Sequence, residues 1–338
     1  MGGLETLDNQ TGGSQSSSAK SFSLVYGPVP SRRLGRSLGI NNIPPKICSY
    51  SCVYCQVGRT INKSIERRPF YPVEQIVREV EQRVRQVRER GERIDYLSFV
   101  PDGEPTLDIN LGKAIELLKP LGIRIAVITN ASLLWRRDVR EDLTEADWVS
   151  LKIDTVSETA WRTINQPHEE LAMSAVLKGI REFADMFHGE LATESMFLKG
   201  MNDSRAGVEQ LAAFIAELKP AKAYLAIPTR PSAERGIFPA SEESINMAYQ
   251  IFTGKLPHIE YLIGYEGDAF ASTGVIVEDL LSITAVHPMR RDAVEKLLKK
   301  AGVGWQAVEK LLAERKLIEL KYGGHTFYLR RMEASRWE

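Results

Sequence analysis

The chain has three cysteines, Cys48, Cys52 and Cys55, and all lie within the segment NNIPPKICSYSCVYCQVGRT (41–60). Thiolates are ligands for zinc and for the iron of iron–sulfur clusters. A structural zinc site needs a fourth ligand, and the nearest histidine in the sequence is His168. In a cluster of four irons, three thiolates leave the fourth iron open to a small molecule. The spacing therefore favours a [4Fe-4S] cluster over zinc or over three buried structural cysteines.

Composition excludes several classes of protein. The 338 residues include 44 Lys and Arg against 44 Asp and Glu, so overall charge does not point to nucleic acid or membranes. No apolar run approaches the roughly 18–20 residues that span a bilayer. Clustered cysteines without partners argue against an extracellular disulfide scaffold. The segment 1–21 is rich in Gly and Ser without an apolar signal region, which predicts a flexible tail. We expect a cytoplasmic protein.

Short apolar segments alternate with amphipathic ones through most of the chain. Residues 73–90 place apolar side chains at helical spacing and are followed by Gly91, which predicts a helix that ends there. Alternation of this kind predicts βαβ units, with functional residues at the carboxyl ends of the strands. The predicted fold is α/β, a partial (β/α)6 TIM-like barrel over 22–272. Its expected strands lie near 37–42, 96–100, 124–130, 148–154, 191–198, 221–228 and 259–264, and its further helices near 111–119, 135–143, 158–187, 207–219 and 241–253.

The pattern changes after about residue 273. Three short helices are expected at 277–284, 291–302 and 305–316, followed by a hairpin that turns at Gly323 and Gly324. Three helices and a hairpin predict a winged helix-turn-helix domain over 273–338. Residues 285–338 contain 12 Lys and Arg against 7 Asp and Glu, a mildly basic balance that does not decide between nucleic acid and protein as the partner.

The motif Cys48-x3-Cys52-x2-Cys55, with Tyr54 before the last cysteine, resembles the signature of the radical S-adenosylmethionine (SAM) enzymes. The resemblance covers about 22–270. It implies a [4Fe-4S] cluster whose open iron binds the amino and carboxylate groups of S-adenosyl-L-methionine. It also implies an external one-electron reductant of the flavodoxin or ferredoxin type, and a 5′-deoxyadenosyl radical that takes hydrogen from a substrate.

The resemblance also assigns cofactor contacts. PDGEPTL (101–107) is similar to the Gly-Gly-Glu element of these enzymes, with Asp102 in place of the first glycine. It implies that the Glu104 carboxylate pairs with the cofactor ammonium. Met196 and LIGY (262–265) are further candidates, the latter against adenine, although LIGY fits a core strand equally well. Lys152 and Asp154 have the alternative of a simple ion pair at a strand end. The expected cofactor contacts are Tyr54, Gly103, Glu104, Asn130, Ser132, Lys152, Asp154, Glu194 and Asn202.

Four arginines are candidates for holding phosphate or carboxylate on the substrate: Arg32, Arg33, Arg36 and Arg230. Their alternative is surface ion pairing. The segments FVPDGEPTL, TINQPH, FLKGMNDS and IPTRPSAE resemble the wyosine-base synthases of tRNA, but no cysteine remains for the second cluster of those enzymes.

Two functions of different class remain. In the first, the enzyme acts on tRNA or another nucleic acid that the winged helix grips. In the second, it modifies a peptide or small metabolite, and the winged helix docks a partner. A regulator that senses iron or redox state is a third reading, and the Gly-Glu element argues against it.

Overall fold

The computed structural model describes residues 24–262, 275–286 and 288–331. The predicted tail and residues 263–265 of the LIGY segment lie outside these ranges. An eight-stranded sheet forms the larger part of the fold, in the order β1-β2-β5-β6-β7-β8-β9-β10. Its strands are β1 (Val25–Ser31), β2 (Gly35–Ile40), β5 (Tyr96–Phe99), β6 (Arg124–Thr129), β7 (Trp148–Lys152), β8 (Glu190–Met196), β9 (Lys222–Ala226) and β10 (Ile259–Leu262).

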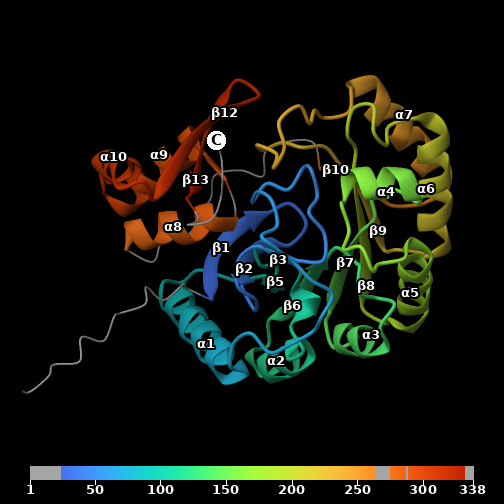
Figure 1. Cartoon of the computed structure of the whole chain (residues 1–338). Helices are drawn as coiled ribbons and strands as arrows, with labels where there is room; N and C mark the ends of the chain where they lie inside the picture. The colour runs from blue at the N-terminus through green and yellow to red at the C-terminus, as the bar shows by residue number, and fades with distance from the viewer. Residues whose placement is uncertain (1–23, 263–274, 287, 332–338) are drawn as a thin grey trace, which may run out of the picture.

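The sheet is parallel from β2 to β10, and in the described chain its two edge strands, β1 and β10, do not pair. It is therefore a curled half-barrel (Figure 1), which confirms the predicted α/β partial barrel. Helices on its convex side connect the parallel strands. They are α1 (Val73–Glu89), α2 (Leu111–Leu118), α3 (Arg137–Leu143), α4 (Glu158–Ile164), α5 (Met173–Met186), α6 (Arg205–Glu217) and α7 (Glu242–Thr253).

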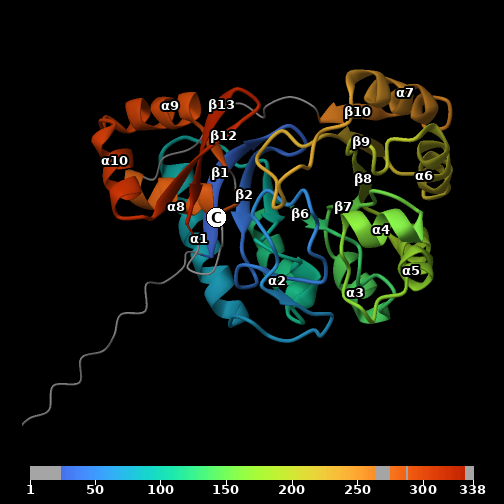
Figure 2. The ribbon, with the colours of Figure 1, turned by 45° about the horizontal axis from the view of Figure 1, so that its top comes forward.

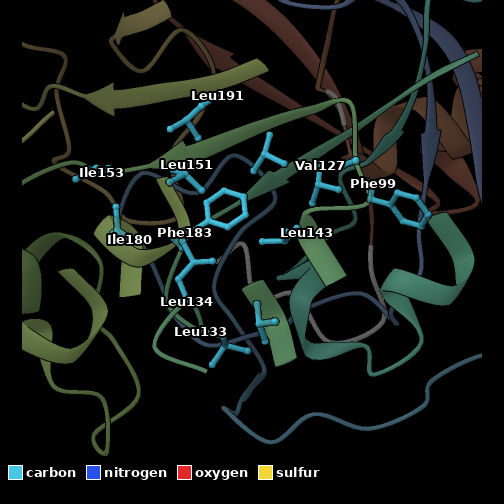
Figure 3. Close-up of a cluster of buried hydrophobic side chains, with 14 of the residues drawn as sticks. Phe99, Val127, Leu133, Leu134, Leu143, Leu151, Ile153, Ile180, Phe183 and Leu191 are labelled. Carbon is cyan, nitrogen blue, oxygen red and sulfur yellow. The ribbon is translucent and has the colours of Figure 1, made fainter. Parts of the chain in front are cut away.

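Alternation along each strand divides the sheet into an outer and an inner face. In β7, Val149 and Leu151 join the main hydrophobic core between sheet and helices, where Phe183 of α5 also packs (Figure 3). Trp148 points to the inner face and belongs to a separate small cluster. Lys152, on the same face as Trp148, lines a cavity. The outer face therefore supplies the core, and the inner face remains available for polar side chains.

The first strand of the sheet, β1, is not among the predicted strands. It pairs antiparallel with β2 and carries Pro28 and Pro30, which interrupt the strand pattern in the sequence. Proline removes a backbone donor and is confined to edge strands or bulges. The structure satisfies this rule, because β1 lies at the edge of the sheet and its pairing with β2 is irregular between Tyr26 and Val29.

The C-terminal module, residues 275–331, contains the three predicted helices and the predicted hairpin. The hairpin turns at Gly323 and Gly324, whose φ angles of 55° and 76° suit glycine. A small antiparallel sheet has the order β11-β13-β12. The elements are α8 (Ile276–Val286), β11 (Met289–Arg290), α9 (Arg291–Ala301), α10 (Gln306–Ala313), β12 (Leu317–Tyr322) and β13 (His325–Arg330).

This module packs against the open edge of the half-barrel. Helix α8 contacts β1, and Val29 of β1 packs against the apolar core of the module. Both views place the module beside β1 and away from α3 to α6 (Figures 1 and 2). Tyr322 of β12 donates a hydrogen bond to the carbonyl of Pro228, which follows β9. The hairpin therefore also reaches the loop after β9, which lies across the opening between the two edge strands of the half-barrel.

Candidate functional site

The three cysteines line one cavity of about 330 Å³ on the inner side of the half-barrel. Cys48 lies in β3 (Ile47–Cys48), which pairs with β4 (Asn62–Lys63) and so closes the base of the cysteine loop. All three thiols are free and partly exposed. Burial raises the pKa of each thiol, that of Cys52 to about 12. Metal coordination would favour the thiolate form of these side chains.

The cysteines are not arranged around a single ion. Within the described ranges, no three His, Cys, Asp or Glu side chains gather as they would around one metal.

The Glu104 carboxylate accepts four hydrogen bonds from the protein. Its Oε1 accepts hydrogen bonds from the Thr106 amide, the Thr106 hydroxyl and the Thr129 hydroxyl, at 3.1, 2.6 and 2.6 Å. Its Oε2 accepts a hydrogen bond from the backbone N–H of Asn130 at 2.8 Å. Glu104 is 1% exposed and does not line the cavity. The side chain ties the loop after β5 to the end of β6, and the expected pairing of its carboxylate with a cofactor ammonium stays a prediction.

The neighbouring Asp102 has different surroundings from Glu104. It lines the cavity, is 2% exposed, and neither carboxylate oxygen has a hydrogen-bond partner among the described residues. Burial raises the pKa of Asp102 to about 7, while Lys46 and Arg330 of β13 act to lower it. The sequence analysis noted Asp102 only as a departure from a glycine. That acidic residue in place of glycine was the one signal in the sequence for a charged group at this position.

Lys46 is a second buried charge on the wall of the same cavity. It is 3% exposed, and its Nζ has no hydrogen-bond partner within the part of the chain that is described. Its φ of 64° lies in the left-handed region, which L side chains rarely adopt. The backbone is held there because the Lys46 amide donates to the Asp102 carbonyl. Sequence reasoning missed this lysine, and its position two residues before Cys48 was the only available signal.

A chain of ionic contacts crosses the inner face of the half-barrel. Glu194 of β8 accepts from Lys152 of β7 at 3.0 Å and also pairs with Arg33. Lys152 Nζ lies 4.8 Å from the centre of the Tyr54 ring. Burial alone would lower the pKa of Lys152, but Glu194 and Asp154 outweigh it and raise the value. Lys152, Glu194, Tyr54 and Met196 all line the cavity, as does Gly103.

The remaining predicted cofactor residues stand behind the cavity wall. Asp154 accepts hydrogen bonds from Tyr54, from Asn165 at 2.7 Å and from the Met196 amide at 2.8 Å. Asn202 donates to the carbonyls of Asp154 and Met196, both at 2.8 Å. Two further predicted contacts, Asn130 and Ser132, bond to Ser49. None of these four predicted residues lines the cavity, so they position it and do not form its surface.

The four predicted substrate arginines separate into two groups. Arg32, Arg33 and Arg230 line the cavity, and Arg230 donates to the Gln56 side chain at 2.7 Å. Arg36 lies near the amino end of β2, where it pairs with Glu92 and donates to the Arg93 carbonyl. The prediction that Arg36 lies at the barrel mouth is wrong, because side chains alternate along β2 and the next residue, Ser37, lines the cavity, so Arg36 points away from it.

A model of the Radical SAM superfamily matches residues 42–212, just over half of the chain. The chain belongs to the radical SAM superfamily. It is accordingly an iron–sulfur enzyme of the SAM-dependent class, with a reaction that this match leaves unspecified. Enzymes of this superfamily generally draw an electron from an external reductant.

Relatives and solved structures agree with this assignment. A UPF0026 protein of Methanocaldococcus jannaschii is 48% identical over 93% of this chain and 98% of its own length. A UPF0026 protein of Helicobacter pylori is 28% identical over 90% of this chain and 97% of its own. A radical SAM methyltransferase from Sphaerobacter thermophilus shares the fold, with a TM-score of 0.53 at 16% identity over 67% of this chain and 66% of that one.

The residues of the cavity fit the groups that the radical SAM superfamily implies. Three free thiols are available for iron. The Asp102 carboxylate and the Lys46 ammonium, which have no hydrogen-bond partner among the described residues, suit the ammonium and carboxylate of the methionyl end of SAM. Gly103 lets the loop after β5 lie close to the backbone of Ile47, because a Cβ at this position would lie 1.9 Å from the Ile47 carbonyl oxygen. As for membranes, none of the described helices combines the length and apolar character needed to cross one.

The burial of Asp102 should make the free energy of unfolding depend on pH. Its native pKa of about 7 exceeds the ordinary value of 3.8, so the metal-free protein loses stability as pH rises between these values. Asp102→Asn removes that cost, and we expect it to raise the free energy of unfolding by about 1–3 kcal/mol near pH 8. The gain should shrink toward about pH 4–5, as measured by urea unfolding.

The matched control is Glu104→Gln, which replaces one carboxylate oxygen, a hydrogen-bond acceptor, by an NH2 group, a donor, among the four donors around this side chain. It should lose stability at both pH values, because at least one of the donors around Glu104 is left unpaired. An Asp102→Asn protein less stable than the wild type near pH 8 would contradict this account of the cavity.

Proposed function

We propose that Cys48, Cys52 and Cys55 hold a [4Fe-4S] cluster with one open iron, and that SAM binds there for a radical hydrogen abstraction. The observation that carries the proposal is the set of three free thiols on the wall of the cavity that also contains Lys46 and Asp102. When bound, the cluster and SAM together supply a 5′-deoxyadenosyl radical. An electron donor of the flavodoxin or ferredoxin type completes the proposal.

In this proposal, residues of the chain bind and orient the cofactor. Lys46 holds its carboxylate and Asp102 its ammonium, as charge-assisted hydrogen bonds. Gly103 permits the close contact of its loop with the Ile47 backbone. Tyr54, Lys152, Glu194 and Met196 would form the part of the cavity wall that meets the nucleoside. Leu262, the described residue of the LIGY segment, lines the same cavity. Glu104, Asn130, Ser132, Asp154 and Asn202 position these groups from behind the wall.

We further propose that the chain is a relative of the wyosine-base synthases that works without a second cluster. The support is arithmetic, because the chain has three cysteines and the one site uses all of them. We place the protein in the cytoplasm, since three free thiols at a cluster site are best kept in a reducing compartment.

We propose that residues 273–338 form a winged helix-turn-helix domain, on the support of its helix and strand order. In helix-turn-helix proteins that read DNA, the second helix lies in the major groove. The corresponding helix, α10, exposes Glu309 as well as Lys310, and Lys310 and Lys316 both pair with Glu314. Lys300 pairs with Glu92 and Arg291 with Glu295. A surface neutralised in this way favours a protein or peptide partner over a polymer of phosphates.

The substrate is therefore proposed to be a peptide or a small metabolite, with the C-terminal module as the docking element. Arg32 and Arg230 at the cavity wall suit a carboxylate or phosphate on it. The tRNA substrate is the second candidate, and it rests on the sequence resemblance alone.

The cluster is tested by metal content. Protein reconstituted without oxygen should bind about four irons per chain and show the absorption of an iron–sulfur cluster. Replacing any one of Cys48, Cys52 and Cys55 by Ala should abolish that absorption, because three thiolates are the minimum for this arrangement. Stoichiometric zinc without iron uptake would refute the proposal.

The charge pair is tested with two ligands that differ only in the amino-acid end. S-adenosylhomocysteine carries it and 5′-methylthioadenosine does not. Lys46→Met should weaken binding of the first to the iron-loaded, unreduced protein by about tenfold or more, since such a hydrogen bond contributes about 1.5–3 kcal/mol. Binding of the second should not change. Lys63→Met is the matched control, because Lys63 bonds to the carbonyls of Gln166 and Pro167 outside the cavity. Equal losses for both ligands, measured by equilibrium dialysis, would disprove this role for Lys46.

The substrate class is tested by filter binding of bulk tRNA across a salt series. A peptide or metabolite enzyme should retain no tRNA, or should retain it without dependence on salt. A tRNA enzyme should lose affinity steeply with salt, because each neutralised phosphate releases counterions. In that case, neutralising Lys299 and Lys321 of the C-terminal module should flatten the slope, and the peptide proposal would be rejected.

A further inference from the structure

Two asparagine side chains donate hydrogen bonds to two of the three cysteine sulfurs. Asn130 Nδ2 lies 3.4 Å from Cys48 Sγ, and Asn165 Nδ2 lies 3.4 Å from Cys52 Sγ. Asn130 follows β6, and Asn165 ends α4, so the two amides reach the cysteine loop from different elements. Sequence reasoning assigned Asn130 to the cofactor and did not single out Asn165.

The surrounding hydrogen bonds determine which way each amide points. Asn130 Oδ1 accepts from the Ser132 amide at 2.9 Å, and a backbone N–H is always a donor, so Nδ2 must face the sulfur. Asn165 Nδ2 also donates to the Asp154 carboxylate at 2.7 Å, which when ionised only accepts. A flipped amide would place oxygen against oxygen at Asp154. Neither asparagine can therefore turn its oxygen to the sulfur without losing a bond.

The location makes these two contacts effective. Asn165 is 5% exposed, and both sulfurs lie on the wall of the cavity. In such an environment of low dielectric, hydrogen bonds act more strongly on charge than they do in water. Hydrogen bonds to the sulfurs are among the factors that set the reduction potential of an iron–sulfur cluster. An added electron increases negative charge on the cysteine sulfurs, and an N–H donor stabilises that form.

We propose that Asn130 and Asn165 are positioning residues that raise the reduction potential of the cluster, so that an external donor can reduce it. The inference rests on the proposed cluster at Cys48, Cys52 and Cys55. The step is the transfer of one electron from the reductant to the cluster. The amides keep their protons, and no bond to them forms or breaks.

The experiment compares midpoint potentials in reconstituted full-length protein by a redox titration followed by electron paramagnetic resonance. Asn130→Ser keeps an oxygen for the Ser132 amide, because serine forms the same local turn, but it is too short to reach Cys48. Asn165→Ser likewise removes the donor to Cys52. Each variant should make reduction about tenfold less favourable, which is about 59 mV for a one-electron couple. The double variant should shift further than either single one.

Ser49→Ala is the matched control. Ser49 Oγ accepts the other hydrogen bond of the Asn130 amide, at 2.9 Å, and the substitution leaves the contact with the sulfur in place. Its midpoint potential should equal that of the wild type. Asn130→Asp and Asn165→Asp provide a second pair that keeps the size of the side chain and lacks the donor, and both should also shift to more negative potential.

Each outcome separates this inference from the proposed function. If wild type and variants hold the cluster at one common potential, the inference is overturned and the cluster proposal stands. If the serine and aspartate variants both lose iron, the asparagines retain the cluster and do not tune it, which also overturns the inference. If the wild type itself takes up no iron, the proposed function fails.

Discussion

The Glu104 carboxylate is the interaction on which the architecture of the site depends. It collects donors from Thr106 after β5 and from Thr129 and Asn130 at the end of β6. The Asn130 side chain then reaches Cys48 and Ser49 in the cysteine loop. One buried carboxylate therefore links three segments that are far apart in sequence. A buried charge is tolerated because donors surround it, and their removal would leave several polar groups unpaired.

The cavity beside this network has the opposite character. Asp102 and Lys46 are as deeply buried as Glu104, but the described residues offer neither side chain a hydrogen-bond partner. Isolated buried charges lower stability, and proteins keep them mainly where a ligand will meet them. The Glu104 carboxylate accepts four hydrogen bonds, and the Asp102 carboxylate two residues away accepts none from the described residues, so two neighbouring acids have very different surroundings.

The C-terminal module has a structural role at the same cavity. A half-barrel exposes an edge, and here α8 covers β1 while Tyr322 reaches the Pro228 carbonyl on the far side of the gap. The charge of Arg330 in β13 acts to lower the pKa of Asp102. Val29 lines the cavity and also packs on the core of the module. A partner that docks on the module therefore binds an element that already touches the cavity wall.

Local pattern determined a large part of this protein. Spacing of Cys48, Cys52 and Cys55 identified the chemistry, because metal ligation depends on residue type and on short separations along the chain. Alternation of apolar runs predicted the parallel half-barrel, its helices and the C-terminal hairpin, since burial on one face imposes a period that the sequence shows directly. Where prolines broke that period, at β1, the prediction failed.

Only the tertiary structure decided which polar side chains are engaged by the protein and which remain available. The sequence assigned a cofactor contact to Glu104 and none to Asp102, and the difference in their surroundings lies in donors from β6 and in a lysine more than fifty residues away. Arg36 looks like its neighbours Arg32 and Arg33, yet it points to the face of β2 opposite to the cavity and pairs with Glu92. The donors that surround a carboxylate and the strand face that meets the cavity depend on distant segments of the chain, and no local pattern contains them.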